Sequence, residues 1–338
     1  MPTTNRQIRL KDRPAGIPSA GNFEIGDLPM PAVADGAVLR RTIYLSLDPY
    51  MRGRMSDAAS YAQPVAIGDV MCGHTVSQVV ESRHPDFRAG DYVTGYDGWQ
   101  QYAVSAGKDL RVLDPGSAPI STALGVLGMP GMTAFVGLMD IAQPKPGETV
   151  VVSAASGAVG AVVGQLAKIT GCRAVGVAGS ADKCRYVVDE LGFDACVNYK
   201  TDDLVPALRA ACPKGVDIYF ENVGGAVFVA VLRVLNQGAR IPLCGMISEY
   251  NATENPPGPN LRALLVKRAM IKGFIVSDHG DRAPAFLREC APLVRDGKIK
   301  FREDIVEGLE KAPSALIGLF EGWNFGKMLV RVSTDPTR

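Results

Sequence analysis

The pattern of hydrophobic and polar positions changes near residue 124. Before that point, short runs rich in β-branched and aromatic residues, such as Val38–Ser46 and Tyr102–Ser105, are separated by glycine, proline and aspartate turns. From 125 to 290, short apolar runs alternate with longer segments of helical periodicity. The first pattern predicts a β-rich domain, and the second predicts an α/β domain with a parallel sheet.

The apolar runs of the second region are strand candidates, and helical segments lie between most of them. The expected strands are Thr149–Ser153, Ala174–Ala178, Ala195–Tyr199, Val216–Phe220, Ala239–Cys244 and Met270–Val276. This alternation fits a doubly wound parallel sheet.

The end of the chain does not continue that pattern. It predicts a helix at Pro284–Asp296 and strands at Ile299–Ile305 and Lys327–Val332. We expect these strands to return to the first domain. The predicted domains are therefore 1–124 together with 291–338, and 125–290.

A glycine turn follows the strand Thr149–Ser153 and opens a helical pattern. In Ala155–Gly160 an alanine takes the place of the first glycine of the GxGxxG motif. Gly157 lets the backbone approach a pyrophosphate, Gly160 lets the helix pack closely on the strand, and Ala158 and Val159 complete the turn. This pattern predicts a dinucleotide site.

The next strand predicts which dinucleotide binds. An NAD-binding fold places an acidic residue at its end to hold the ribose 2′-hydroxyl, but here the strand ends in Gly179 and Ser180, followed by Lys183. Ser180 is expected to cap the next helix, and Lys183 supplies a positive charge for a 2′-phosphate. Arg185 and Tyr199 are further candidates. The expected cofactor is NADP(H).

Two loops after later strands are candidates for the nicotinamide side of the site. Asn222–Gly225 and Cys244–Ser248 each follow the carboxyl end of an expected strand, where ligands bind in open α/β sheets. Taken singly, Asn222 is also a turn former and Cys244 a small buried hydrophobe.

The composition limits the classes of molecule that the chain is expected to bind. The 36 basic and 35 acidic residues nearly balance, which argues against nucleic acid or an anionic membrane as a partner. No apolar run is long enough to span a bilayer, and no signal-like segment opens the chain. The seven cysteines are scattered without a CxxC pair, so we expect reduced thiols in the cytoplasm.

Several segments together resemble the zinc-independent medium-chain dehydrogenases/reductases of the leukotriene B4 12-hydroxydehydrogenase, prostaglandin reductase and alkenal double-bond reductase group, with the strongest similarity to the bacterial NADPH-dependent curcumin/dihydrocurcumin reductase branch. The segments are Leu45–Met55, Leu127–Ala134, Ala154–Gly160, Tyr219–Gly225, Cys244–Asn251 and Gly322–Lys327. The resemblance implies a Rossmann domain inserted into a GroES-like catalytic domain. It also implies a homodimer.

The resemblance also implies positions for cofactor residues. It places Lys183 and Tyr199 on the 2′-phosphate and Asn222 and Cys244 along the cofactor. The further residues implied near the nicotinamide are Met129, Thr133, the main chain of Phe274 and Val276, and Asn324.

No metal site is expected. Zinc-dependent relatives hold a catalytic metal with Cys, His and Glu, whereas His74 here lies in Gly-His-Thr and the segment expected to supply the thiolate is Ser46–Tyr50. We interpret His74 as structural.

For an enone substrate, hydride addition to the β-carbon moves negative charge to the carbonyl oxygen, which hydrogen-bond donors stabilise. Tyr250 is the first candidate donor, and Tyr61 and Tyr50 are the others. The sequence predicts an NADPH-dependent reductase of α,β-unsaturated ketones or aldehydes. A quinone reductase and a non-enzymatic NADPH-binding protein remain alternatives.

Overall fold

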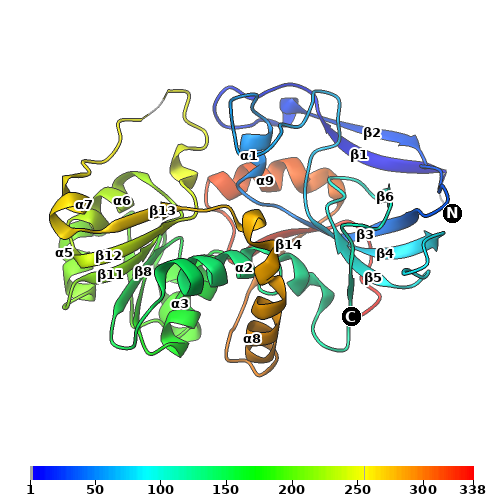
Figure 1. Cartoon of the computed structure of the whole chain (residues 1–338). Helices are drawn as coiled ribbons and strands as arrows, with labels where there is room; N and C mark the ends of the chain where they lie inside the picture. The colour runs from blue at the N-terminus through cyan, green and yellow to red at the C-terminus, as the bar shows by residue number, and fades with distance from the viewer. Residues whose placement is uncertain (1–2, 255) are drawn as a thin grey trace. The chain divides into compact units, whose positions relative to one another are not determined.

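The computed structural model describes residues 3–254 and 256–338, and the chain divides into two compact units (Figure 1). Unit 1 comprises the described residues up to Gly125, together with Glu303–Asn324 and Met328–Arg338. Unit 2 comprises Val126–Arg302 and Phe325–Lys327.

Unit 2 is built on a parallel sheet of six strands in the order β10-β9-β8-β11-β12-β13. Their bounds are β8 (Thr149–Ser153), β9 (Arg173–Ala178), β10 (Ala195–Asn198), β11 (Val216–Phe220), β12 (Leu235–Leu243) and β13 (Met270–Gly273). The strand order reverses between β8 and β11, which is the switch point where such sheets bind ligands. The predicted doubly wound Rossmann sheet is confirmed.

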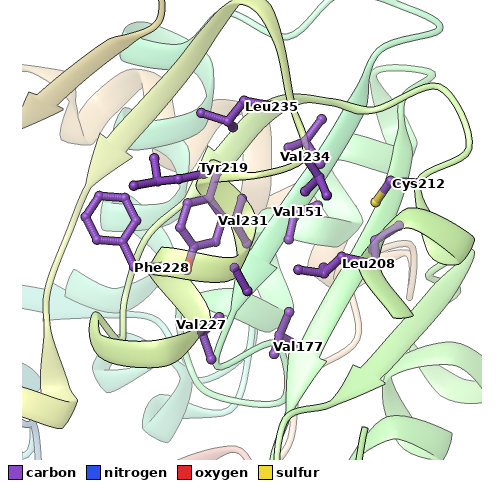
Figure 2. Packing of buried hydrophobic residues seen from close by; sticks show 14 of the residues in the cluster. Val151, Val177, Leu208, Cys212, Tyr219, Val227, Phe228, Val231, Val234 and Leu235 are labelled. Atoms are coloured by element: carbon purple, nitrogen blue, oxygen red, sulfur yellow. The ribbon is translucent and has the colours of Figure 1, made fainter. Parts of the chain in front are cut away.

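Helices connect the strands of this sheet. They are α2 (Met129–Phe135), α3 (Gly160–Ile169), α4 (Ala181–Arg185), α5 (Leu204–Ala211), α6 (Gly225–Leu232), α7 (Arg262–Lys267) and α8 (Ala283–Arg295). Figure 2 shows part of the core, in which apolar side chains of β8, β9 and β11 meet those of α5 and α6. Val151, Leu208 and Val231 are fully buried there. Burial of each such side chain stabilises the fold by about 1.5–3 kcal/mol.

Unit 1 is the GroES-like β-rich part of the chain. Its larger sheet contains β3 (Val38–Ser46), β4 (Thr75–Ser82), β5 (Tyr92–Gly95), β6 (Tyr102–Ser105), β7 (Arg111–Leu113), β14 (Glu303–Glu307) and β15 (Lys327–Arg331). β1 (Thr4–Leu10) and β2 (Phe23–Pro29) form an antiparallel pair, and the helices are α1 (Met51–Arg54) and α9 (Ala312–Phe320). The central strand β3 pairs antiparallel with β4, β6 and β15.

A buried polar network fixes the turn after β5. Asp97 is ion-paired with Arg40, and both side chains are almost fully buried. The Asp97 carboxylate also accepts hydrogen bonds from Thr75 (2.8 Å) and Ser77 (3.2 Å). Several strands therefore meet at one carboxylate.

The C-terminal part of the chain differs from the sequence-based expectation. Ile299–Ile305 was expected to be a strand, but β14 begins only at Glu303. Lys300 instead exchanges hydrogen bonds with the Gln165 side chain, at 2.7 and 2.8 Å. The Gln165 side chain thus satisfies the Lys300 main-chain amide and carbonyl, which in a strand would have bonded to a neighbouring strand.

The same bonds explain why residues 291–302 pack with unit 2. The predicted domain bounds differ from the compact units in this stretch and remain a prediction. The expected strands Thr149–Ser153 and Val216–Phe220 of unit 2 occur with the predicted bounds, and the others of this sheet occur with shifted ends; for example, β13 stops at Gly273 instead of Val276. Among the described helices, none combines the length and apolar character that crossing a bilayer requires.

Candidate functional site

The glycine turn after β8 is tight and sterically restricted. Ala154 adopts a left-handed conformation (φ 52°), and its carbonyl accepts a hydrogen bond from Gly157 N at 2.9 Å. A Cβ at Gly160 would lie 2.4 Å from that carbonyl oxygen, and one at Gly157 would lie 3.1 Å from it. Glycine is thus required at 160, and a side chain at 157 would make a tight contact. The turn leads through Ala158 and Val159 into α3.

The alanine in place of the first motif glycine has a structural explanation. Ala155 is fully buried, and a Cβ on Gly176 of the neighbouring strand β9 would lie only 2.7 Å from the Ala155 methyl carbon. The glycine on β9 therefore makes the room that the methyl group occupies.

The segment Phe325–Lys327 lies against the glycine turn. Gly326 forms a parallel β-bridge with Gly157, and the Lys327 amide donates to the Arg302 carbonyl at 2.8 Å. A Cβ on Gly326 would approach that carbonyl oxygen to 2.2 Å. Asn324, the predicted cofactor residue, directly precedes this segment. Sequence reasoning did not predict the bridge, because Gly157 and Gly326 are distant in sequence.

The residues expected at the 2′-phosphate lie together at the ends of β9 and β10. The Ser180 hydroxyl caps α4 by accepting from Lys183 N at 3.2 Å. Tyr199 follows β10, and its ring lies beside Gly179, where a Cβ would be 2.9 Å from the nearest ring atom. This arrangement presents a lysine, a serine and a phenol at one edge of the sheet. Arg185, also a candidate, is ion-paired with Asp182.

The loop after β11 is tied to the end of β8. Asn222 donates from its main-chain amide to the Ser153 hydroxyl (2.8 Å) and from its side-chain amide to the Ser153 carbonyl (2.9 Å). Cys244 follows β12, and burial raises the pKa of its thiol to about 12. The thiol is therefore neutral near pH 7, which suits a packing role better than a nucleophilic one.

Tyr250 lies close to both of these loops. Its hydroxyl oxygen accepts from Met246 N at 3.4 Å. A Cβ on Gly245 would lie 2.7 Å from that hydroxyl and 3.6 Å from the Asn222 carbonyl oxygen. Because Gly245 has no side chain, the Tyr250 phenol can reach the carboxyl ends of β11 and β12. The loop Glu249–Asn260 contains Asn255, which lies outside the described residues.

The remaining predicted residues of unit 2 flank the sheet. Thr133 is buried and donates to the Met129 carbonyl at 2.8 Å within α2. Phe274 follows β13 and is mostly buried, with its ring edge-on to Phe220. Val276 begins a short 3₁₀ segment that follows the strand. The structure therefore leaves the Phe274 and Val276 main chain at the end of the edge strand.

Unit 1 contains a separate cluster of aromatic and polar side chains. The Arg54 guanidinium lies 6.0 Å from the Tyr50 ring centre and 5.8 Å from that of Tyr61, so the two predicted tyrosines are neighbours. Tyr61 is 60% exposed, whereas the Tyr50 hydroxyl is buried. Burial, followed by the nearby Asp48 carboxylate, raises the pKa of Tyr50 well above its usual value.

Tyr96 joins this cluster and was not predicted. Burial raises its pKa, as does the neighbouring Cys72. The His74 ring packs edge-on against the Tyr96 ring at 4.8 Å, in keeping with a structural role for this histidine. The only signal in the sequence was a tyrosine in the turn directly after a short strand.

No three His, Cys, Asp or Glu side chains within residues 3–254 and 256–338 are grouped so that they could hold a metal ion. Cys72 and His74 both lie next to Tyr96.

The chain is similar to known proteins along nearly its whole length. Residues 6–113 match the family described as the N-terminal domain of oxidoreductase, and residues 158–291 match the family described as zinc-binding dehydrogenase. The chain is 55% identical to the NADPH-dependent curcumin reductase of Escherichia coli (strain K12), over 98% of each chain. It is 43% identical to the NADP(+)-dependent 2-alkenal reductase of Nicotiana tabacum, also over 98% of each. CurA from Vibrio vulnificus, solved in complex with NADPH, superposes with a TM-score of 0.94 at 52% identity, covering 98% of this chain and 100% of that one.

Proposed function

The chain belongs to the double-bond reductase group of the medium-chain dehydrogenase/reductase family, and we propose that it uses NADPH to reduce the C=C bond of α,β-unsaturated ketones and aldehydes. The observation that carries this proposal is the end-to-end similarity to NADPH-dependent reductases. The grouping of Ser180, Lys183 and Tyr199, where a 2′-phosphate is proposed to bind, supports it. Curcumin-type compounds and alkenals are the substrate classes to test first.

The residues present fit NADP(H). In the turn Ala155–Gly160, Gly157 and Gly160 carry no side chains, which lets a pyrophosphate approach the backbone. β9 ends without the acidic residue that would repel a 2′-phosphate, and Lys183 supplies a cation in the helix α4 that follows. The loops that carry Asn222 and Cys244 are proposed to line the nicotinamide half.

NADPH, when bound, supplies the hydride that adds to the β-carbon of the enone. As the C–H bond forms, the π electrons of the C=C bond move toward the carbonyl, whose oxygen becomes negatively charged. Tyr250 is proposed to donate a hydrogen bond to this oxygen, with Tyr50 and Tyr61 as further hydroxyl donors. A proton from a hydroxyl of the site or from water then adds to the α-carbon and completes the saturated product.

The test of this assignment is Tyr250→Phe. Removing a donor of this kind costs about 2.7–4 kcal/mol of transition-state stabilisation. We therefore expect kcat with an enone to fall by about a hundredfold or more while the Kd for NADPH stays nearly constant. An unchanged kcat would remove Tyr250 from the mechanism.

The activity itself is tested by following NADPH oxidation with a panel of enones, alkenals and small quinones. Turnover that favours enones supports the proposal, whereas turnover that favours quinones would indicate a quinone reductase. Tight NADPH binding without turnover above background would indicate a non-enzymatic binding protein.

The exposed edge of the unit 2 sheet supports a second proposal, that the chain forms a homodimer. β13 pairs with β12 on one side and with no other described strand, and its four residues are all exposed. Ile271 on β13 and Leu265 and Val266 on the preceding helix α7 add exposed apolar surface, with Leu265 80% exposed. An isologous contact with a second copy would cover this edge and continue the sheet.

Sedimentation equilibrium tests this contact. We expect a dimer for the native chain and a monomer for the double variant Leu265→Glu, Ile271→Lys. A native chain that is monomeric would exclude the proposed contact.

The proposed location is the cytoplasm, whose reducing conditions suit seven free cysteines.

A further inference from the structure

Glu221 is a fully buried carboxyl at the carboxyl end of β11. One oxygen, Oε1, accepts hydrogen bonds from the Ser153 hydroxyl (2.9 Å), Val223 N (2.6 Å) and Gly224 N (3.0 Å). This oxygen therefore connects the last residue of β8 to the loop after β11.

The main chain of Glu221 adds a third connection. Its carbonyl accepts from Cys244 N (2.9 Å) and Gly245 N (3.2 Å), in the loop after β12. Its amide donates to the Pro242 carbonyl at 3.0 Å. One residue thus holds the loops after three neighbouring strands of the sheet.

Asn222 depends on this arrangement. The Ser153 hydroxyl that donates to Glu221 also accepts from Asn222 N, and the Asn222 side chain donates to the Ser153 carbonyl. Gly224 and Gly225 follow with left-handed φ angles of 80° and 56°. Glycine gives this loop little intrinsic rigidity, so its shape depends on hydrogen bonds. These are the bonds to Glu221 and those that Ser248 donates to the Val223 carbonyl.

We propose that Glu221 is a positioning residue that sets the geometry of the loops binding the nicotinamide half of NADPH. The inference rests on the proposed function in one respect, namely that the loops carrying Asn222 and Cys244 contact this half of the cofactor.

The proposed role requires an oxygen acceptor and no negative charge. Burial raises the pKa of the Glu221 carboxyl, although the bonds from Val223 and Gly224 oppose this. The second oxygen, Oε2, accepts no hydrogen bond within the described part of the chain. Glutamine at this position would keep the acceptor that Oε1 provides and would break none of the bonds above.

The experiment compares two ligands by calorimetry: NADPH, and 2′,5′-ADP, which has the adenosine half alone. We expect Glu221→Ala to weaken NADPH binding about tenfold, while the Kd for 2′,5′-ADP stays within about twofold, because lost hydrogen bonds of this kind are each worth about a kcal/mol. Glu221→Gln should keep the native ratio of the two Kd values. Equal weakening of both ligands, or a Gln variant that behaves like Ala, would overturn the proposal.

Asp217→Ala is the matched control. Asp217 lies in β11 near the end opposite to Glu221, and its carboxylate accepts from Thr149 N and the Asn236 side chain, both at 2.8 Å. We expect this variant to lose thermal stability without changing the ratio of the two Kd values. A ratio that changes as much as in Glu221→Ala would also overturn the proposal.

Ser153→Ala replaces Glu221→Ala if that variant does not fold. It removes one donor to Oε1 and the acceptor of Asn222 N, so NADPH binding should weaken in the same direction while 2′,5′-ADP binding is kept. If the ratio of the two Kd values in Ser153→Ala were the same as in Asp217→Ala, the proposal would be wrong. Failure of the proposed function would look different. In that case the native protein would bind NADPH without reducing enones, and the variants would still show this pattern of Kd values.

Discussion

The two compact units position their candidate residues in different ways. In unit 2, main-chain turns at the carboxyl ends of parallel strands carry the candidate residues, and side chains are absent at glycines 157, 160, 179 and 245. In unit 1, Tyr50 and Tyr61 lie beside Arg54, and Tyr96 is followed by Asp97, which a buried ion pair holds. Cofactor binding in unit 2 should therefore be sensitive to added side-chain volume. The stability of unit 1 should instead be sensitive to the loss of a polar partner.

The largest expected effect comes from breaking the buried ion pair of unit 1. Arg40→Met leaves the Asp97 carboxylate buried without its cation, which costs about 3–5 kcal/mol. Urea unfolding should show this as a lower midpoint. The control Arg6→Met breaks an exposed pair with Asp27 and should lower the midpoint far less, because solvent screens this pair. Equal effects of the two substitutions would contradict the contrast.

The corresponding change in unit 2 adds volume to the glycine turn. Gly160→Ala forces a Cβ to within 2.4 Å of the Ala154 carbonyl oxygen unless the turn moves. Overpacking of this kind costs about 1–3 kcal/mol, and NADPH affinity should fall with it. Gly280→Ala, where a Cβ would meet nothing within 4 Å, is the control and should bind NADPH normally.

A smaller effect should separate the two cofactors. Lys183→Ala removes a cation from the proposed 2′-phosphate site, and a hydrogen bond to a charged group contributes about 1.5–3 kcal/mol. NADPH should bind about 10- to 100-fold more weakly, whereas NADH affinity should hardly change. Lys168→Ala removes a lysine of the same unit that is paired with Asp194, and it should affect neither. Equal loss for NADPH and NADH would mean that Lys183 does not recognise the phosphate.

The smallest expected effect is a pH dependence of stability in unit 2. Burial raises the pKa of Glu221 above its ordinary value of 4.5, so the folded state favours the protonated carboxyl. The native chain therefore loses stability as the pH rises from the ordinary value through the raised one. Glutamine does not titrate, so the Tm of Glu221→Gln relative to native should increase over this range. A difference in Tm that is constant with pH would show that the carboxyl keeps its ordinary pKa.

Much of unit 2 could be predicted from the sequence, because its signals are local. Apolar runs separated by helical periods gave the six strands, and the glycines of Ala155–Gly160 gave the turn. The Ser180 cap on α4 was also predicted and is present. Strand ends were less accurate, since side chains such as Gln165, 135 residues before Lys300, take backbone bonds that a strand would have made.

The residues that sequence reasoning missed are those whose role depends on distant partners. Tyr96 is a surface-turn tyrosine in the sequence, and only the fold brings it next to Tyr50 and Cys72. Glu221 is a charged residue within a motif, but its three donors to Oε1 come from two different strand ends.

The order of apolar, glycine and charged residues was enough to predict the parallel sheet, the turn Ala155–Gly160 and the Ser180 cap, because each depends on neighbours within a few positions. Folding alone decided which buried carboxyls hold the loops, that Gly326 pairs with Gly157, and that Arg40 reaches Asp97 across 57 positions of sequence. Such contacts join residues whose separation along the chain carries no periodic signal, so they exist only once the strands have paired.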